Sequence, residues 1–157
     1  MTAQICDQLI WKGKRYSLYV EPFFQYQKQY PGKRRQFAFM HTTTANWRGY
    51  RARWEIKDDY LWLTAISGWV WQDQGKPRYY RMAQVMDTRD PVQALWYTGT
   101  LILPFGALLR YVHMPYASKY AREWRIKVVK GKIEQIEEVK SASSKKKNIL
   151  PPKSKTK

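Results

Sequence analysis

The sequence has few of the residues that build common catalytic and metal sites. It contains one cysteine, Cys6, and 2 histidines among 157 residues. A single cysteine cannot form an internal disulfide, and a zinc site would need carboxylates from distant positions. The motifs GxGxxG, GxxxxGK[ST], HExxH, CxxC and GxSxG do not occur. We therefore expect no metal and no cofactor, and an enzyme, although possible, has no motif in its favour.

Long apolar runs are also missing. None approaches the roughly 18 residues typical of a membrane-spanning helix. The N-terminal sequence MTAQICDQLIWKGK lacks the charged-then-apolar pattern of a signal peptide. A cytoplasmic location is therefore the default expectation.

Acidic residues are scarce relative to basic ones. The chain has 29 Lys and Arg but 12 Asp and Glu, which gives a net charge of +17. Six of the lysines lie in residues 145–157, where there is no acid, so residues 1–140 carry 23 basic and 12 acidic residues, or +11. This balance favours a polyanionic partner such as nucleic acid. The alternative is a solubility trait with no specific partner.

The apolar residues recur with a period of two along most of the chain, and aromatic residues make up 16% of it. This pattern, with regularly spaced turn signals, predicts a mostly-β domain. We expect one domain over residues 1–140, folded as an antiparallel β-sandwich or barrel, with a first hairpin in residues 7–20. Residues 23–36 should form a long loop or a short, weak helix. The Lys-rich residues 141–157 have almost nothing to bury and should form a disordered tail.

Residues 45–66, ANWRGYRARWEIKDDYLWLTAI, predict a central β-hairpin. Side chains alternate across a strand, so its first strand should have an apolar face and a charged face. The apolar face is Tyr50, Ala52, Trp54 and Ile56, and the other is Gly49, Arg51, Arg53 and Glu55. A two-residue turn at Asp58-Asp59 would place Trp54 opposite Leu63, Glu55 opposite Trp62, and Ala52 opposite Ala65.

The charged face of this hairpin is the candidate polyanion-binding surface. Cations mixed with aromatic rings are typical of proteins that bind single-stranded nucleic acid, because the rings stack on bases. The residues proposed for this role are Arg48, Arg51 and Arg53 with Trp47 and Trp62, extended by Arg34, Arg35, Lys145, Lys146 and Lys147. The competing interpretation is that the tryptophans belong to the core and the arginines form only a solvated face.

A second group of residues could line a ligand pocket. His113 ends a predicted strand and is followed by Tyr116, Ser118 and Tyr120, so it could act as a general base. Glu55 could join them, although a lone carboxylate among arginines is expected to be ionised and paired. The alternative for His113 is a hydrogen-bonded histidine that helps to fix a loop.

Two stretches carry a resemblance to a known family. The first contains Thr44, Ala45, Trp47 to Tyr50, Ala52 and Trp54 to Ile56, in the pattern TAxWRGYxAxWEI. The second lies between residues 94 and 120, in the pattern GTLxxPxGxxLxYVHMxYxSxY. Together they resemble a family of small, uncharacterised bacterial proteins. Leu95, Pro115 and Ala121 depart from the family pattern, in which an acidic residue, a glycine and a glutamate are expected. The resemblance implies a bacterial, single-domain protein and no particular activity.

The leading hypothesis is a non-enzymatic basic protein that binds nucleic acid or another polyanion. A module that recognises an acidic protein, such as an inhibitor or accessory factor, would use the same charge with the many tyrosines and tryptophans. A small enzyme or ligand-binding protein using His113 is the third possibility.

Overall fold

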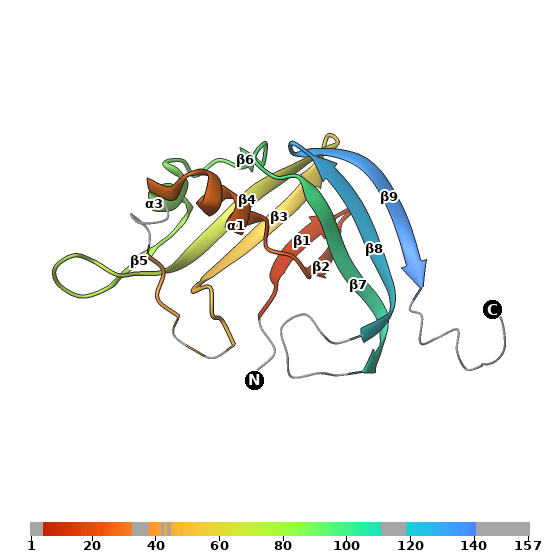
Figure 1. Cartoon of the computed structure of the whole chain (residues 1–157), viewed down its shortest axis with the longest axis horizontal. Coiled ribbons are helices and arrows are strands. Elements are labelled where there is room, and N and C mark those ends of the chain that lie inside the picture. The colour runs from red at the N-terminus through yellow and green to blue at the C-terminus, as the bar shows by residue number, and fades with distance from the viewer. Residues whose placement is uncertain (1–4, 33–37, 42, 44, 111–118, 141–157) are drawn as a thin grey trace.

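The computed structural model describes residues 5–32, 38–41, 43, 45–110 and 119–140, with the side chains of 107–110 and 119 left aside (Figure 1). Strands dominate this part of the chain, which confirms the mostly-β prediction. The strands are β1 (Asp7–Trp11), β2 (Lys14–Leu18), β3 (Tyr50–Lys57), β4 (Tyr60–Val70), β5 (Arg78–Tyr80), β6 (Val92–Gln93), β7 (Gly99–Arg110), β8 (Lys119–Val129) and β9 (Lys132–Lys140). The helices are α1 (Pro22–Gln29) and α3 (Met82–Met86).

All of these strands belong to one curved sheet. Its order is β2-β1-β3-β4-β9-β8-β7, and the short strands β5 and β6 pair with β4 (Figure 1). The two ends of the sheet come close, since the N–H of Tyr19, just after β2, donates to the carbonyl of Ile102 in β7 at 2.8 Å. The sheet is nevertheless not closed into a barrel, and one sheet cannot form a two-sheet sandwich.

The prediction of a purely antiparallel sheet is wrong at one pair of strands. β1 and β3 run parallel, with Gln8 opposite Arg53 and Ile10 opposite Glu55. Parallel neighbours need a long crossover connection. The chain supplies one through β2, α1 and residues 30–49, which together return the chain to the starting end of β1. β1 and β2 confirm the predicted first hairpin. For residues 23–36 the structure has the short helix, α1, and not the long loop, with residues 33–36 outside the described part of the chain.

The central hairpin β3–β4 forms as predicted up to one irregularity. Asp58 and Asp59 make the two-residue turn with φ of 54° and 64°, the left-handed conformation that a twisted hairpin needs. Trp54 lies opposite Leu63 and Glu55 opposite Trp62, as predicted. Beyond that point the register shifts by one residue.

The shift comes from a β-bulge at Thr64. Arg53 pairs with Ala65 whereas Trp54 pairs with Leu63, so Thr64 is an extra residue in β4. Ala52 therefore lies opposite Ile66, and the predicted pairing of Ala52 with Ala65 is wrong. The bulge keeps Ile66 buried at 2% exposure and leaves Ala65 on the outer side.

The inner side of the curved sheet holds the hydrophobic core. Trp54 is fully buried at its centre, and α1 packs against β3 through Phe23, whose ring lies 5.2 Å from that of Tyr50. The other large core residues include Leu9, Leu18, Leu61, Leu63, Ile66, Leu101, Leu103 and Ile126. Neither described helix has the length and apolar character needed to cross a bilayer. The predicted tail, residues 141–157, lies outside the described residues.

Candidate functional site

The outer side of β1, β2, β3 and β4 brings arginines from several segments together. Arg51 and Arg53 alternate with buried residues on β3 and are both exposed. The parallel pairing of β1 with β3 places Gln8 beside Arg53, and the antiparallel pairing of β1 with β2 places Arg15 next to Ile10. These strands therefore present their polar side chains on one continuous surface.

This surface is hollowed into a groove of about 600 Å³. We call this hollow the arginine groove, because four exposed arginines line it: Arg15, Arg51, Arg53 and Arg81. The other residues are Ile5, Cys6, Gln8, Ala52, Ala65, Ile66, Ser67, Tyr79 and Met82. No carboxylate lines the groove, and within the described residues none of the four arginines is in an ion pair. The groove therefore concentrates positive charge and offers many hydrogen-bond donors.

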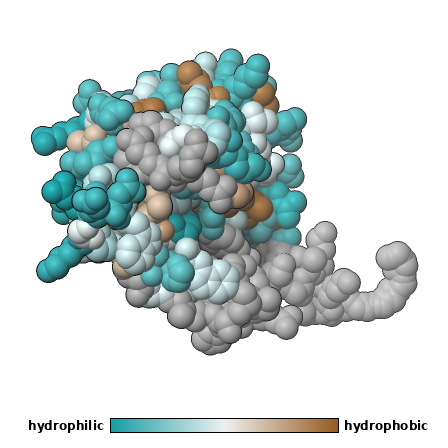
Figure 2. Space-filling view, turned by 60° about the vertical axis from the view of Figure 1, so that its left-hand side comes forward, coloured by the Kyte–Doolittle hydropathy of each residue, from teal (hydrophilic) through white to brown (hydrophobic). Residues whose placement is uncertain are grey.

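Arg81 reaches the groove from another part of the chain. It precedes α3, and its guanidinium lies 4.9 Å from the centre of the Tyr79 ring, within the range of a cation–π contact. The Tyr79 hydroxyl also forms a 2.9 Å hydrogen bond with Ser67. These contacts hold the rim of the groove in one geometry. The end of the molecule that contains β5 and α3 comes forward in Figure 2, and its surface is mostly hydrophilic with scattered apolar patches.

A smaller recess of about 200 Å³ adjoins the arginine groove. Its lining residues are Asn46, Gly49, Arg51, Ser67, Gly68, Trp69 and Tyr79. Arg51, Ser67 and Tyr79 line both hollows, so the two lie side by side. Trp69 and Tyr79 are cross-strand partners on β4 and β5, and both remain more than two-fifths exposed.

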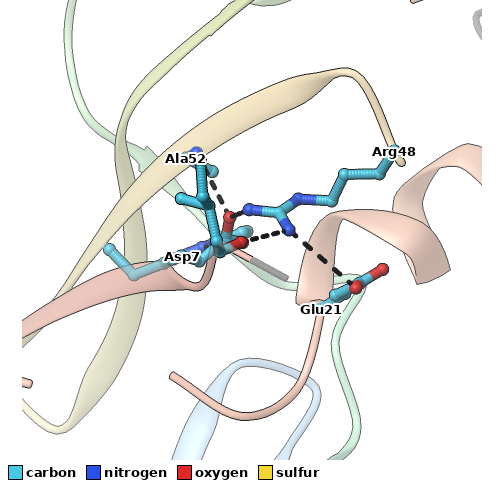
Figure 3. Close-up of polar contacts among 6 residues, drawn as sticks. Asp7, Glu21, Arg48 and Ala52 are labelled. Atoms are coloured by element: carbon cyan, nitrogen blue, oxygen red, sulfur yellow. Dashed lines mark hydrogen bonds and ion pairs between the residues drawn. The ribbon is translucent and has the colours of Figure 1, made fainter. Parts of the chain in front are cut away.

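Arg48 does not belong to this surface, so its assignment to the exposed binding face is wrong. Its side chain is 8% exposed and forms an ion pair with Asp7, whose side chain is fully buried (Figure 3). The guanidinium also donates a 2.8 Å hydrogen bond to the carbonyl of Ile5 and lies 4.0 Å from the Glu21 carboxylate. Its position just before β3 directs Arg48 to the start of β1, and it is not among the residues that line the arginine groove.

Asp7 is the centre of this buried network. One carboxylate oxygen accepts hydrogen bonds from Arg48 and, at 3.2 Å, from the backbone N–H of Ala52. The other accepts from the indole N–H of Trp54 at 3.0 Å. Burial raises the pKa of Asp7, and the charge of Arg48 and these donors oppose that shift. The network joins β1 to β3, which indicates a structural role.

Cys6 lines the arginine groove and immediately precedes Asp7 of this network. Burial raises the pKa of its thiol to about 11, with the nearby Arg48 charge acting in the opposite direction. A thiol with such a pKa is almost entirely protonated at neutral pH and is a poor nucleophile. The cysteine therefore has the properties of a packing residue.

The remaining predicted residues on this side are dispersed. Trp47 is 44% exposed, whereas Trp62 is half-buried and donates its indole N–H to the carbonyl of Lys57 at 3.0 Å. Neither is among the residues that line the groove or the recess. Glu55 is half-buried opposite Trp62, as predicted, at the end of β3 that lies beyond Arg53.

The predicted ligand pocket is not assembled by the residues that the structure describes. Tyr120 lies on β8 and packs against Tyr19, with ring centres 6.4 Å apart. β4 and β9 separate β3, which carries Glu55, from β8 in the sheet order. The other members, His113, Tyr116 and Ser118, lie outside the described residues, as do Arg34, Arg35, Lys145, Lys146 and Lys147 of the predicted binding surface.

Sequence reasoning missed Arg15, Arg81, Trp69 and Tyr79. Arg15 alternates with apolar residues in the first hairpin, so its outward direction follows from the sequence, but its place in the groove depends on the pairing of β2 with β1 and of β1 with β3. Trp69 follows the same outward alternation after the bulge. Arg81 and Tyr79 lie in a segment with no clear period, and nothing local marks them as part of a site.

Comparison with protein-family models, curated proteins and solved structures gave no match for this chain. The resemblance to a bacterial family therefore stays a prediction. In its first motif, Gly49, Tyr50, Ala52 and Trp54 are buried, as expected of residues that determine a fold. The pattern leaves positions 51 and 53 open, and these carry the arginines of the groove. Among the described residues there is also no group of three or more His, Cys, Asp or Glu placed to hold a metal.

Proposed function

We propose that this protein is a non-enzymatic binding protein for nucleic acid and that the arginine groove is its binding surface. The observation that carries the proposal is the gathering of Arg15, Arg51, Arg53 and Arg81 around one hollow that no carboxylate lines. Guanidinium groups suit phosphate well, because their planar donors can form two parallel hydrogen bonds with it.

The wider charge supports the same partner. The net charge of +17 creates a long-range attraction for any polyanion, and the groove gives that attraction a local target. On β8, two exposed arginines are compensated. Arg122 lies 3.4 Å from Glu138, and Arg125 lies 2.6 Å from Glu123. The groove arginines differ from these two because none of them has an acidic partner among the described residues.

These compensated arginines provide a matched control. The test compares the double variant Arg51→Gln/Arg53→Gln with Arg122→Gln/Arg125→Gln, since both remove two positive charges from an exposed sheet surface. Binding of labelled single-stranded DNA and RNA is measured by fluorescence polarisation across a salt series. Loss of two phosphate contacts should reduce the steepness of log K against log salt by about 1.4, at about 0.7 per contact.

The groove variant should lose both affinity and salt dependence, and the β8 control should retain most of each. Equal losses in the two variants would show that only overall charge matters and would refute the groove as a site. An absence of binding by the wild-type protein at about 50 mM salt, where phosphate contacts are strong, would refute nucleic-acid binding altogether.

A segment of an acidic protein is the second candidate partner. The exposed aromatic residues beside the groove, Trp69 and Tyr79, favour it because such residues are enriched at protein interfaces. A pull-down that recovers one acidic protein after nuclease treatment, and loses it with Arg51→Gln/Arg53→Gln, would favour this partner over nucleic acid.

A further inference from the structure

The recess beside the arginine groove has a different chemical character from the groove itself. Arg51 lies at the junction of the two, and the recess then continues between Trp69, Tyr79 and the buried Asn46. A ligand that occupied both hollows would therefore place an anionic group at Arg51 and an adjoining flat, partly apolar group against Trp69. A nucleotide unit has this pair of features, with its phosphate next to its base.

We infer that the recess binds one unpaired base of a single-stranded nucleic acid, stacked on Trp69, while Arg51 binds an adjacent phosphate. This inference rests on the proposed function and adds to it the form of nucleic acid that the site selects. In a duplex the base faces are covered by neighbouring bases, so only an unpaired base can stack on a protein ring.

The geometry of the aromatic pair suits this role. The Trp69 indole is 44% exposed, and its ring centre lies 5.3 Å from that of Tyr79 with an angle of 63° between the planes. Because the two rings are not face to face, a planar group can still stack on Trp69. Tyr79 is fixed by Ser67 and Arg81, so it braces the indole. A ring that is already held in place loses little conformational entropy when a ligand binds.

Asn46 is a buried polar residue in the lining of the recess. Its residue exposure is 7%, and its side-chain oxygen has no hydrogen-bond partner among the described residues. An unpaired buried acceptor is costly, and most such groups in proteins are satisfied. Because this oxygen is itself covered by protein, a base N–H in the recess would reach it only after the Asn46 side chain rotates.

The test separates the base from the phosphates. Fluorescence polarisation compares oligo(dT) with an abasic oligonucleotide of equal length and phosphate number, at about 12 nucleotides, within the range of common single-strand site sizes. The wild-type protein should bind oligo(dT) about tenfold more tightly than the abasic strand, an effect within the range of one stacked base. A duplex of the same length should show no such advantage.

Trp69→Ala should abolish the preference for oligo(dT) and leave abasic binding and its salt dependence unchanged. The matched control is Trp71→Ala, because Trp71 is 57% exposed and two residues further along but is not among the lining residues of either hollow. It should keep the tenfold preference. Circular dichroism and urea unfolding check that both variants fold.

Equal affinity of the wild-type protein for oligo(dT) and the abasic strand would overturn the base-binding recess and leave the arginine groove intact as a phosphate site. The same holds if Trp69→Ala keeps the preference or Trp71→Ala loses it. Failure of the wild-type protein to bind either strand would instead refute the proposed function, and this inference with it.

Discussion

The buried ion pair between Asp7 and Arg48 makes a strong prediction about stability. In Asp7→Asn, the side chain keeps its size but loses its charge, so the Arg48 guanidinium loses its fully buried carboxylate partner and is left with the partly exposed Glu21 carboxylate, 4.0 Å away. The Asn side chain also replaces one acceptor oxygen by an NH₂ donor. Whichever way the amide is turned, its NH₂ group faces another donor: either the indole N–H of Trp54 or the N–H groups of Arg48 and Ala52. The substitution therefore affects β1, β3 and the segment before β3 together.

The expected magnitude follows from the burial of both partners. The Arg48 and Asp7 side chains are 8% and 0% exposed. Removing one member of a buried pair typically costs about 3–5 kcal/mol, because the remaining charge is left uncompensated. A domain of this size has a free energy of unfolding of about 5–15 kcal/mol, so the variant should be close to the limit of stability.

Urea unfolding followed by tryptophan fluorescence measures this loss directly. With a urea dependence of about 2 kcal/mol per molar, the midpoint should fall by about 1.5–2.5 M. Arg122→Gln is the control, because its partner Glu138 is partly exposed, and it should change the free energy of unfolding by less than about 1 kcal/mol. A loss below about 1 kcal/mol in Asp7→Asn would contradict this expectation, since it would mean that Glu21 or water compensates the charge of Arg48.

Three further predictions concern neighbouring features. In Arg48→Met, the guanidinium no longer opposes the effect of burial, so the pKa of Asp7 rises further. The loss of unfolding free energy relative to wild type, measured from urea midpoints, should be largest at pH 8 and shrink towards pH 5, because protonation removes the buried charge of Asp7. Because the pKa of Cys6 is about 11, its alkylation at pH 8 should be about 100-fold slower than that of free cysteine and should accelerate up to that pKa. Gly49→Ala should cost about 2 kcal/mol or more in unfolding free energy, because φ is +85° and the new Cβ would lie 2.9 Å from the carbonyl oxygen of Met40. Gly13→Ala is the control: its φ is +75° but no atom lies within 4 Å of the new Cβ, so it should cost about 1 kcal/mol.

The parts of the fold that the sequence predicted depend on local rules. The alternation of Tyr50, Ala52 and Trp54 with Arg51 and Arg53 follows from the period of two in a strand, and all five side chains lie on the predicted sides. The parallel pairing of β1 with β3 and the bulge in β4 do not follow from local rules. Both depend on how distant segments pack against one another, which a single sequence does not encode in any short pattern.

The same distinction explains the outcome for the site. Arg51 and Arg53 were found because their direction is set within one strand. Arg48 was misassigned because it precedes the strand, and only the position of Asp7 on a separate strand decides that its charge is buried. Arg15 and Arg81 were missed because they join Arg51 and Arg53 around the groove only after the sheet has formed.

The contrast between the two kinds of arginine also bears on function. Arg48 is held by a buried carboxylate, and its place is explained by the fold alone. The four arginines of the groove have no such partner among the described residues, and bringing like charges together opposes folding. A fold that needed only solubility could spread these charges over its surface or pair them with acids, as it does on β8 with Arg122 and Arg125. Because the groove gathers positive charge at a cost to stability, a ligand that neutralises it is the simplest physical reason for its arrangement.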